Sequence, residues 1–367
     1  MSVYAQLGIR RVINASATLT RLGGSLMPPE VLAAMVDAAE WFVDLPDLQR
    51  RVGRRIADLT HNDDCYVSSG AAAGITIAVA ACITGDDPDL IEAMPYLDGV
   101  QHTEVVVLRS QRNGYDYAAR QTGVRLVEIE ADPEELRRAL TDRTACVLWF
   151  AGARYASETL SLAEVIAIAH GAGVPVLVDA AAQIPPIANL WHFTQELGAD
   201  VAIFSGGKGL RGPQSSGLVL GRREIIEACR PNGSPNHGIG RPMKVGKEEL
   251  AGILAAVEWS LAQDEAAILA GYERSVRRWV QGLAGIPGVT VARAYPSEAG
   301  QPHGRAVVTL GPGARLSRDR AVAALWERDP RVAVSPVGDD AIALNPQTLQ
   351  PGEDEIVLAA VHDVLTG

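Results

Sequence analysis

The chain has 367 residues, of which 47% are hydrophobic and 21% are charged, and its formal net charge is −11. This length allows one large domain plus a smaller one, with a sizeable core. The negative charge disfavours binding to nucleic-acid backbones, and the apolar content excludes disorder as the main state. Anionic small molecules are not excluded, because a few local cations can override the net charge.

The cysteines and the N-terminus indicate where the protein works. Cys65, Cys82, Cys146 and Cys229 lie far apart and form no CxxC pair, so neither a zinc site nor a redox dithiol is expected. The first residues contain no targeting leader, and no stretch approaches the ~20 apolar residues of a membrane span. We therefore expect a cytoplasmic protein without a metal site.

From about residue 62 to residue 221, short β-rich runs alternate with longer helical stretches. The helical stretches include residues 133–140 and 162–173. The runs are apolar almost throughout, as is typical of strands buried on both faces. This alternation predicts an α/β fold with a mostly parallel, doubly wound sheet. The strands are expected at residues 105–109, 125–129, 145–150, 174–180, 201–205 and 217–221.

After residue 221 the pattern changes to α+β content with antiparallel character. A loop rich in Pro, Gly and Asn precedes a long helical pattern at about 247–284. We expect three parts: an N-terminal segment, 1–45, that packs on both domains, a large domain, 46–245, and a smaller α+β domain, 246–367. The other expected elements are a helix at about 29–41, a helix near 317–328, and strands at 289–294, 305–310, 332–334 and 341–344.

Lys208 is the first candidate catalytic residue. It directly follows an apolar strand and stands inside a glycine-rich turn, and such glycines let the backbone approach a ligand closely. The functional interpretation is a Schiff-base lysine whose amine condenses with a carbonyl cofactor. The alternative interpretation is a tight turn with an incidental lysine.

Asp179 stands at the C-terminal end of a buried strand, one predicted helix and one predicted strand before Lys208. Ligands of open α/β sheets bind at this end of the strands, so both residues are expected at one edge of the same sheet. A carboxylate buried there is unfavourable unless it meets a positive partner, such as the protonated pyridine nitrogen of pyridoxal phosphate. A helix N-cap is the alternative role for Asp179.

The third candidate feature is a possible phosphate site, where a strand gives way to a small-residue helix. Backbone N–H groups at such a helix start, together with the helix dipole, bind anions. The candidate residues are Ser69, Gly70, Ala71 and Ala72. The order of phosphate turn, strand-end Asp and strand-end Lys is more specific than any of these features alone.

With these residues the sequence resembles fold-type-I pyridoxal-phosphate enzymes, in the group of selenocysteine synthase (L-seryl-tRNA(Sec) selenium transferase) and D-glucosaminate-6-phosphate ammonia-lyase. The resemblance implies the aspartate aminotransferase-like fold and pyridoxal 5'-phosphate as cofactor. It also implies Lys208 as the internal aldimine, Asp179 at the pyridine nitrogen, and Gln183 and Ser205 facing the cofactor. The stretches that carry it are 12–25, 67–74, 111–129, 176–186, 204–221 and 240–250.

Differences in short sequence motifs separate the branches of this group. The transferase branch usually reads FSGDK where this chain reads FSGGK, and the RGPQ and MKVGKEE stretches are closer to the ammonia-lyase branch. Selenocysteine synthases carry a tRNA-binding domain ahead of the VINASATLT segment, whereas eleven residues precede it here. Where family members often read YDH, this chain reads Tyr115-Asp116-Tyr117, so the aromatic residue that stacks on the cofactor is left open.

The expected function is that of a lyase acting on a small β-hydroxy amino acid or amino sugar acid, with α,β-elimination to a 2-oxo acid and ammonia. An amino-acid racemase or epimerase and an aldolase need the same Lys and Asp and stay open, while a tRNA-dependent selenium transferase is disfavoured by the acidic charge. The resemblance implies a homodimer or larger homo-oligomer, with no nucleic-acid or membrane partner. Candidate substrate-binding residues, each alternatively a solvated surface group, are Arg112, Tyr115, Arg211, Arg241 and Lys244.

Overall fold

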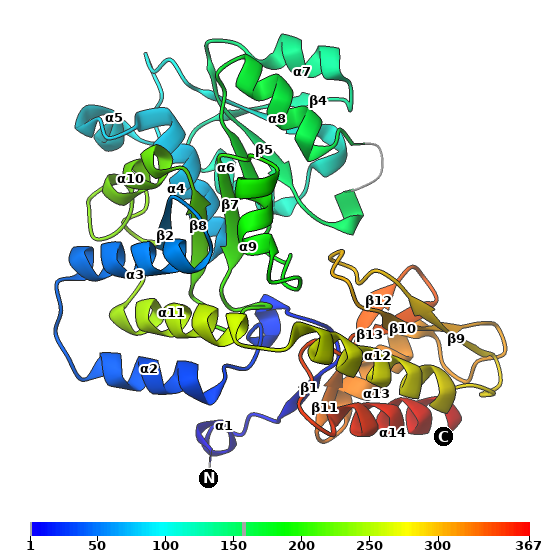
Figure 1. Ribbon diagram of the computed structural model, residues 1–367. Coiled ribbons are helices and arrows are strands. Elements are labelled where there is room, and N and C mark those ends of the chain that lie inside the picture. The colour runs from blue at the N-terminus through cyan, green and yellow to red at the C-terminus, as the bar shows by residue number, and fades with distance from the viewer. Residues whose placement is uncertain (1, 156–158) are drawn as a thin grey trace. The chain divides into compact units, whose positions relative to one another are not determined.

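The computed structural model describes residues 2–155 and 159–367, which form two compact units (Figure 1). Unit 2 contains residues 27–263, and unit 1 joins the N-terminal residues up to Leu26 to residues 264–367. This division differs from the boundaries expected at residues 45 and 245. The N-terminal residues belong to unit 1 because β1 (Val12–Asn14) pairs in parallel with β11 (Arg331–Ala333).

A seven-stranded sheet forms the centre of unit 2, with the strand order β2-β8-β7-β6-β5-β3-β4. Its strands β3 to β7 are parallel, as predicted, whereas β8 is antiparallel to both of its neighbours, β7 and β2. A short loop joins β7 to β8, and a parallel pairing would require a longer crossover. The strands are β2 (Asp64–Ser68), β3 (Glu104–Leu108), β4 (Arg125–Ile129), β5 (Thr144–Phe150), β6 (Val176–Asp179), β7 (Val201–Ser205) and β8 (Gly217–Gly221).

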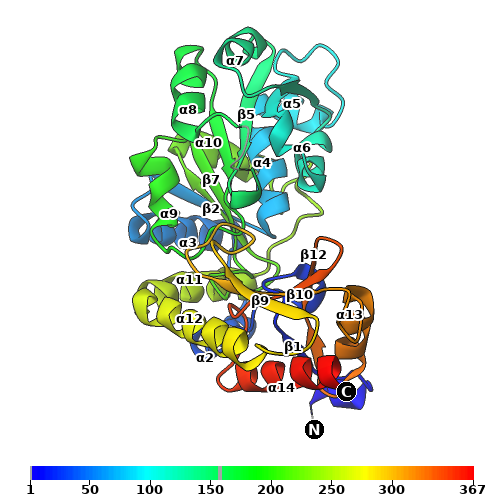
Figure 2. The ribbon, with the colours of Figure 1, turned by 90° about the vertical axis from the view of Figure 1, so that its right-hand side faces the viewer.

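Helices cover both faces of this sheet, and Figure 2 shows α4 and α8 on opposite sides of β5 and β7. Alternate residues of the strands contribute to two hydrophobic cores, one on each face of the sheet. Val147 and Val178 pack with α8, while Cys146 and Leu177 pack with α4. The helices of unit 2 are α2 (Pro29–Ala39), α3 (Leu45–Leu59), α4 (Ala71–Thr84), α5 (Pro88–Ala93), α6 (Tyr117–Arg120), α7 (Pro133–Ala139), α8 (Leu162–Gly171), α9 (Asn189–Trp191), α10 (Arg223–Asn232) and α11 (Lys247–Leu261). Short turns of other helix types are η2 (Arg109–Gln111), η3 (Gly114–Asp116), η4 (Ala153–Tyr155) and the π-helical η5 (His192–Glu196).

The long helical pattern expected at 247–284 is two helices in different units. Leu261 ends α11, which packs against α2 and α3 in unit 2 (Figure 1). Asp264 starts α12 (Glu265–Gly282) in unit 1, where its side chain accepts a hydrogen bond from the Ala267 N–H at 3.0 Å. The N-cap therefore divides a pattern that periodicity alone presents as continuous.

Unit 1 is built on a four-stranded antiparallel sheet with the order β12-β13-β10-β9. Its core surrounds the fully buried Trp279, whose indole N–H donates to the Asp354 carbonyl at 2.9 Å. The strands are β9 (Val289–Ala294), β10 (Arg305–Leu310), β12 (Ser335–Val337) and β13 (Ala341–Leu344). The remaining helices are α1 (Val3–Gln6), η1 (Thr20–Leu22), α13 (Arg318–Glu327) and α14 (Glu353–Thr366). In the described part of the chain, no helix has the length and apolar character needed to cross a bilayer.

Candidate active site

The register of the sheet brings the three predicted sequence features to one edge. Strands β2 and β7 run in the same direction, because each is antiparallel to the β8 strand between them. Gly217 of β8 pairs with Ser68 on one side and with Ser205 on the other. Asp179, at the end of β6, pairs with Ile203 of β7. The turn before α4, the Lys208 loop and Asp179 therefore follow β2, β7 and β6 at the same end of these strands.

The first turn of α4 forms the phosphate turn. Gly70 precedes the helix with a φ of 123°, and no described side chain caps the first N–H groups of this 14-residue helix. A Cβ atom on Gly217 would lie 2.7 Å from the Gly70 carbonyl carbon, so only glycine there lets α4 begin directly over the sheet edge. Ser69 is partly exposed and Ala72 is exposed. An uncapped helix start of this length fits the phosphate of a cofactor.

Asp179 is 9% exposed, and its Oδ1 accepts a hydrogen bond from the Ala181 N–H at 3.0 Å. Burial raises the pKa of this carboxyl group, while the Ala181 N–H and the charge of Lys208 lower it. A carboxylate in this position is stabilised by a positive group nearby. The pyridine nitrogen of pyridoxal phosphate supplies such a group.

The loop that carries Lys208 is closed by close backbone contacts. A Cβ atom on Gly207 would lie 2.5 Å from the Gln214 Cα, and one on Gly209 would lie 2.1 Å from the Ile184 oxygen. The glycines in this turn therefore permit an approach that no other residue allows. Lys208 itself is partly buried; burial lowers its pKa, and the charge of Asp179 raises it.

The chain contains only three lysines, and they occupy different surroundings. Lys244 is exposed. The Nζ of Lys247 donates to the Ala38 carbonyl and to the Glu248 carboxylate, both at 2.6 Å. Of the three, Lys208 is the one that interacts with Asp179 at the sheet edge, so it is the lysine best placed for a Schiff base.

Gln183 and Ser205, which the resemblance also points to, lie at the same edge. Gln183 is 9% exposed, and its Nε2 donates to the Ala151 carbonyl at 3.3 Å. Ser205 ends β7, and its N–H donates to the Ala181 carbonyl at 3.3 Å. These contacts join the segments that follow β5, β6 and β7.

The candidate substrate-binding residues have varied surroundings. The guanidinium of Arg112 donates to the Asp116 carboxylate at 2.5 Å and also to Glu128, so substrate binding by Arg112 would compete with two ion pairs. The side chain of Tyr115 is 65% exposed. The guanidinium of Arg211 lies over the Trp259 ring, 5.4 Å from its centroid. Arg241 is partly exposed, and Lys244 is exposed.

Gln111 is a positioning residue that the sequence interpretation passed over. It is fully buried; its Oε1 accepts from the Phe150 N–H at 2.9 Å, and its Nε2 donates to the Thr159 hydroxyl at 3.2 Å. It thereby fixes the end of β5, where Phe150 pairs with Asp179. One indication of this role was present in the sequence, the position of Gln111 beside Arg112 in the stretch 111–129 that carries the family resemblance.

The comparisons with known proteins agree with this geometry. The family model for aminotransferase class-V matches residues 107–240. The chain is 34% identical to 5'-C-glycyluridine monooxygenase-decarboxylase of a Streptomyces species, over 99% of this chain and 92% of that protein. It is 30% identical to D-glucosaminate-6-phosphate ammonia lyase of Salmonella typhimurium, over 99% of this chain and 98% of that protein. The chain belongs to this family of fold-type-I pyridoxal-phosphate enzymes.

A solved structure of D-glucosaminate-6-phosphate ammonia-lyase supports the same assignment. It has a TM-score of 0.83 and 30% sequence identity, and the match covers 99% of this chain and 98% of that one. The family, the fold class and the cofactor, pyridoxal 5'-phosphate, are thus confirmed. The uncapped turn of α4, the buried Asp179 and the partly buried Lys208 fit this cofactor.

Proposed function

We propose that the chain is a pyridoxal-phosphate-dependent lyase that removes ammonia from a small β-hydroxy amino acid or amino sugar acid and leaves a 2-oxo acid. The observation that carries the proposal is the similarity to D-glucosaminate-6-phosphate ammonia-lyase, which extends over nearly the whole of both chains at a TM-score of 0.83. The arrangement of Asp179 and Lys208 at one sheet edge supports it, because the elimination requires both an anchored cofactor and a base.

Each residue at the edge has a role in this proposal. The first turn of α4 would hold the cofactor phosphate, Gln183 and Ser205 would lie beside the ring, and Asp179 would keep a proton on the ring nitrogen. Pyridoxal phosphate, when bound, supplies the electron sink for the charge left at the substrate Cα. Lys208 would hold the cofactor, and its free amine would remove the Cα proton of the substrate. Its lowered pKa favours the neutral amine that this step needs.

The elimination step breaks the Cα–H bond and the Cβ–O bond. The Cα proton passes to the Lys208 amine, and the β-hydroxyl leaves as water after it takes up a proton. The released enamine takes up a proton at Cβ and becomes an imine. Water then adds at Cα of the imine, which releases ammonia and yields the 2-oxo acid. We propose that the acid groups of the substrate are held by cations from Arg211, Arg241 and Lys244, with Arg112 and Tyr115 as further candidates.

A second candidate function is oxidative decarboxylation of an amino acid. It is favoured by one observation, the 34% identity to a protein named a monooxygenase-decarboxylase. An amino-acid racemase or epimerase and an aldolase also use a lysine and an aspartate placed in this way. A decarboxylase and an aldolase break a different bond at Cα, whereas a racemase breaks the same Cα–H bond as the lyase and returns a proton to Cα.

A substrate panel tests the proposal. The purified enzyme is given D- and L-hydroxy amino acids and a phosphorylated amino sugar acid, and 2-oxo acid, ammonia, oxygen uptake and Cα-proton exchange in heavy water are followed. We expect ammonia and 2-oxo acid in equal amounts without oxygen uptake. Proton exchange without ammonia would replace the lyase by a racemase, and oxygen uptake with carbon dioxide release would favour the second candidate.

We also propose a cytoplasmic homodimer or larger homo-oligomer that binds no nucleic acid. All four cysteines are free thiols, which supports a reducing compartment, and the net charge of −11 disfavours nucleic acid. The exposed apolar side chains of α2, Leu32 and Val36, support assembly with another copy. Sedimentation of the purified enzyme tests the assembly, and a fully active monomer would contradict it.

A further inference from the structure

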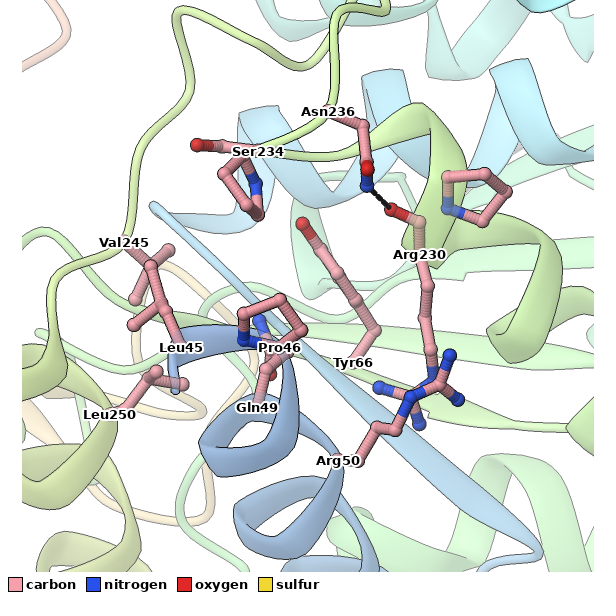
Figure 3. A pocket seen from close by; sticks show the side chains of 12 residues that line it. Leu45, Pro46, Gln49, Arg50, Tyr66, Arg230, Ser234, Asn236, Val245 and Leu250 are labelled. Carbon is pink, nitrogen blue, oxygen red and sulfur yellow. Dashed lines mark hydrogen bonds between the residues drawn. The ribbon is translucent and has the colours of Figure 1, made fainter. Parts of the chain in front are cut away.

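A cavity of about 230 Å³ lies beside β2, the edge strand of the seven-stranded sheet (Figure 3). Its wall comes from the start of α3, from β2, from the end of α10 with the loop that follows it, and from α11. None of the described residues that line it is among the candidate cofactor or substrate residues. The cavity is therefore a separate place in unit 2, and the proposed reaction does not explain its side chains.

Arg230, in the wall of this cavity, has hydrogen-bond donors without acceptors. Its side chain is 9% exposed, and its Nη2 donates to the Asp64 carboxylate at 3.0 Å. Its Nε lies 3.2 Å from a Glu227 oxygen without the alignment of a hydrogen bond, and its Nη1 has no hydrogen-bond partner among the described residues. A guanidinium keeps its proton, so these N–H groups remain donors. Buried donors of this kind are unfavourable until an acceptor reaches them.

Tyr66 adds a second donor to the wall. It is 2% exposed, and in the part of the chain that the structure describes its hydroxyl has no hydrogen-bond partner. Burial raises the pKa of this hydroxyl, so it keeps its proton. Figure 3 shows the hydroxyl directed toward the loop that carries Ser234 and Asn236. The Arg230 guanidinium lies beyond the other end of the Tyr66 ring, so the two open donors stand at different ends of the cavity.

Arg50 places a second guanidinium next to that of Arg230, because both pair with Glu227. The Arg50 Nη1 lies 2.8 Å from one Glu227 oxygen, and the Arg230 Nε lies 3.2 Å from the other. With Asp64 included, two cations face two carboxylates, and these four side chains carry no net charge. The unpartnered N–H groups of Arg230 can stabilise one added negative charge, whereas a second charge would be repelled by Asp64 and Glu227.

The rest of the wall favours an apolar ligand body. The polar side chain of Gln49 is already used, because its amide binds both the carbonyl and the N–H of Val67, at 2.7 and 3.2 Å. A cavity of about 150 Å³ can bind benzene, so 230 Å³ accommodates a six-membered ring with an attached acid group. The apolar wall residues are Leu45, Pro46, Pro231, Pro235, Val245 and Leu250.

We propose that the cavity is a binding site for a small organic monocarboxylate with an apolar body. The carboxylate lies between the guanidinium groups of Arg230 and Arg50, whose planar N–H pairs match its two oxygens. An oxygen at the other end of the ligand accepts a hydrogen bond from the Tyr66 hydroxyl. The site shares no lining residue with the cofactor site, so the ligand and the cofactor bind to the same chain at the same time.

Titration calorimetry of the cofactor-loaded enzyme tests the proposal with 4-hydroxybenzoate as the probe. We expect saturable binding of one molecule per chain. The amide 4-hydroxybenzamide has the same shape without the charge, and inorganic phosphate lacks the apolar body, so both should bind roughly 10-fold or more weakly. Equal binding of the amide or of phosphate would overturn the assignment of a carboxylate, and so would the absence of saturable binding.

Variants of α3 locate the bound acid. Pro46→Trp should abolish binding, because Pro46 is exposed at the cavity and a tryptophan side chain there fills the space. Arg50→Gln should weaken binding roughly 10-fold or more through the loss of a charged donor. Arg55→Gln is the matched control and should change nothing, since Arg55 lies on the same helix, is 54% exposed and pairs with Glu258 at 3.0 Å. Binding that neither Pro46→Trp nor Arg50→Gln weakens would place the acid elsewhere and overturn the proposal.

Tyr66→Phe tests the other end of the ligand. It should weaken binding of 4-hydroxybenzoate by roughly 2- to 10-fold and leave that of benzoate unchanged, because benzoate has no oxygen at the far end of its ring. An equal effect on the two acids would overturn the role of Tyr66. None of these readouts uses turnover, so a failure here is distinct from a failure of the proposed reaction.

Discussion

The carboxylate of Asp179 and the ammonium group of Lys208 interact across the carboxyl edge of the seven-stranded sheet, and each shifts the pKa of the other toward the charged form. Burial has the opposite and larger effect on both groups, because it raises the pKa of Asp179 and lowers that of Lys208. Burial thus moves the pKa of each group in the direction that favours its neutral form. Such groups are typical of catalytic sites, and the first three predictions below test this pair.

Replacement of Lys208 should abolish covalent cofactor binding. Lys208→Ala should fold, because a partly buried loop lysine contributes little to the core, yet turnover should fall by at least roughly 10²–10⁴-fold. Lys244→Ala is the control, since that lysine is exposed. The measurements are the visible absorbance of the enzyme and peptide mapping after borohydride reduction. An adduct on Lys244 or Lys247 would contradict the assignment of Lys208.

Asp179→Asn should slow turnover far more than it destabilises the fold. The amide cannot hold a proton on the ring nitrogen, and loss of a charge-assisted hydrogen bond of about 1.5–3 kcal/mol corresponds to about 10- to 150-fold in rate. Cofactor retention should also decrease. Turnover equal to that of the wild type would show that the aspartate acts as a structural cap.

Asp200 provides a matched control for this variant. It is also buried, but it precedes β7 at the opposite edge of the sheet, where its carboxylate accepts from the Val176 N–H at 2.7 Å and pairs with Arg222 at 2.9 Å. Asp200→Asn should lower the free energy of unfolding and leave turnover per folded enzyme unchanged. Urea unfolding and steady-state kinetics on both variants separate the two roles.

The lowered pKa of Lys208 predicts a pH-dependent stability of the cofactor-free enzyme. Between this pKa and the unfolded value of about 10.4, the unfolded chain binds more protons, so the free energy of unfolding of the wild type rises with pH. Lys208→Met should therefore be more stable than the wild type at neutral pH, and this advantage should disappear as the pH approaches about 10.4. Urea unfolding over this pH range measures it, with Lys244→Met as the exposed control. An equal advantage at every pH would contradict the prediction.

The close packing of the Lys208 loop can be tested with an added methyl group. Gly209→Ala would place a Cβ 2.1 Å from the Ile184 oxygen, and such overpacking costs roughly 1–3 kcal/mol of stability. It should also displace Lys208 and weaken cofactor binding. Gly171→Ala in α8 meets no atom within 4 Å and should instead stabilise the fold by roughly 0.4–1 kcal/mol. Thermal and urea unfolding compare the two, and equal effects would show that the loop can relax.

Much of unit 2 follows from local sequence. The runs that became β3 and β5 to β8 are continuous and apolar, so their burial on both faces could be predicted without knowing their neighbours. For β4 that prediction was wrong, because β4 is the last strand of the sheet and its Arg125 and Glu128 are exposed. Asp179 and Lys208 could be singled out because each follows such a run, and the carboxyl ends of parallel strands meet at one edge. Gly70 and the small residues of α4 likewise indicated an anion site before the fold was known.

Other features depend on contacts between residues far apart in the chain. The pairing of β1 with β11, the antiparallel direction of β8 and the division of the 247–284 pattern were not predicted, because hydrophobic periodicity contains no information about which partner a strand meets. Gln111 looks like any polar loop residue until the Phe150 N–H is placed beside it.

The exposure of the aromatic segment at residues 41–43 could not be predicted from the sequence either. An apolar run before a helix has the composition of a core segment, and only the packing of α2 and α3 decides that it faces outward. The sequence by itself determined the strands, the cofactor-binding chemistry and the edge of the sheet where it lies, because these rest on local composition and on the shared direction of parallel strands. The tertiary structure alone decided which side chains are exposed, which are paired and which cavity stays open, because burial is a property of residues that the chain brings together from distant positions.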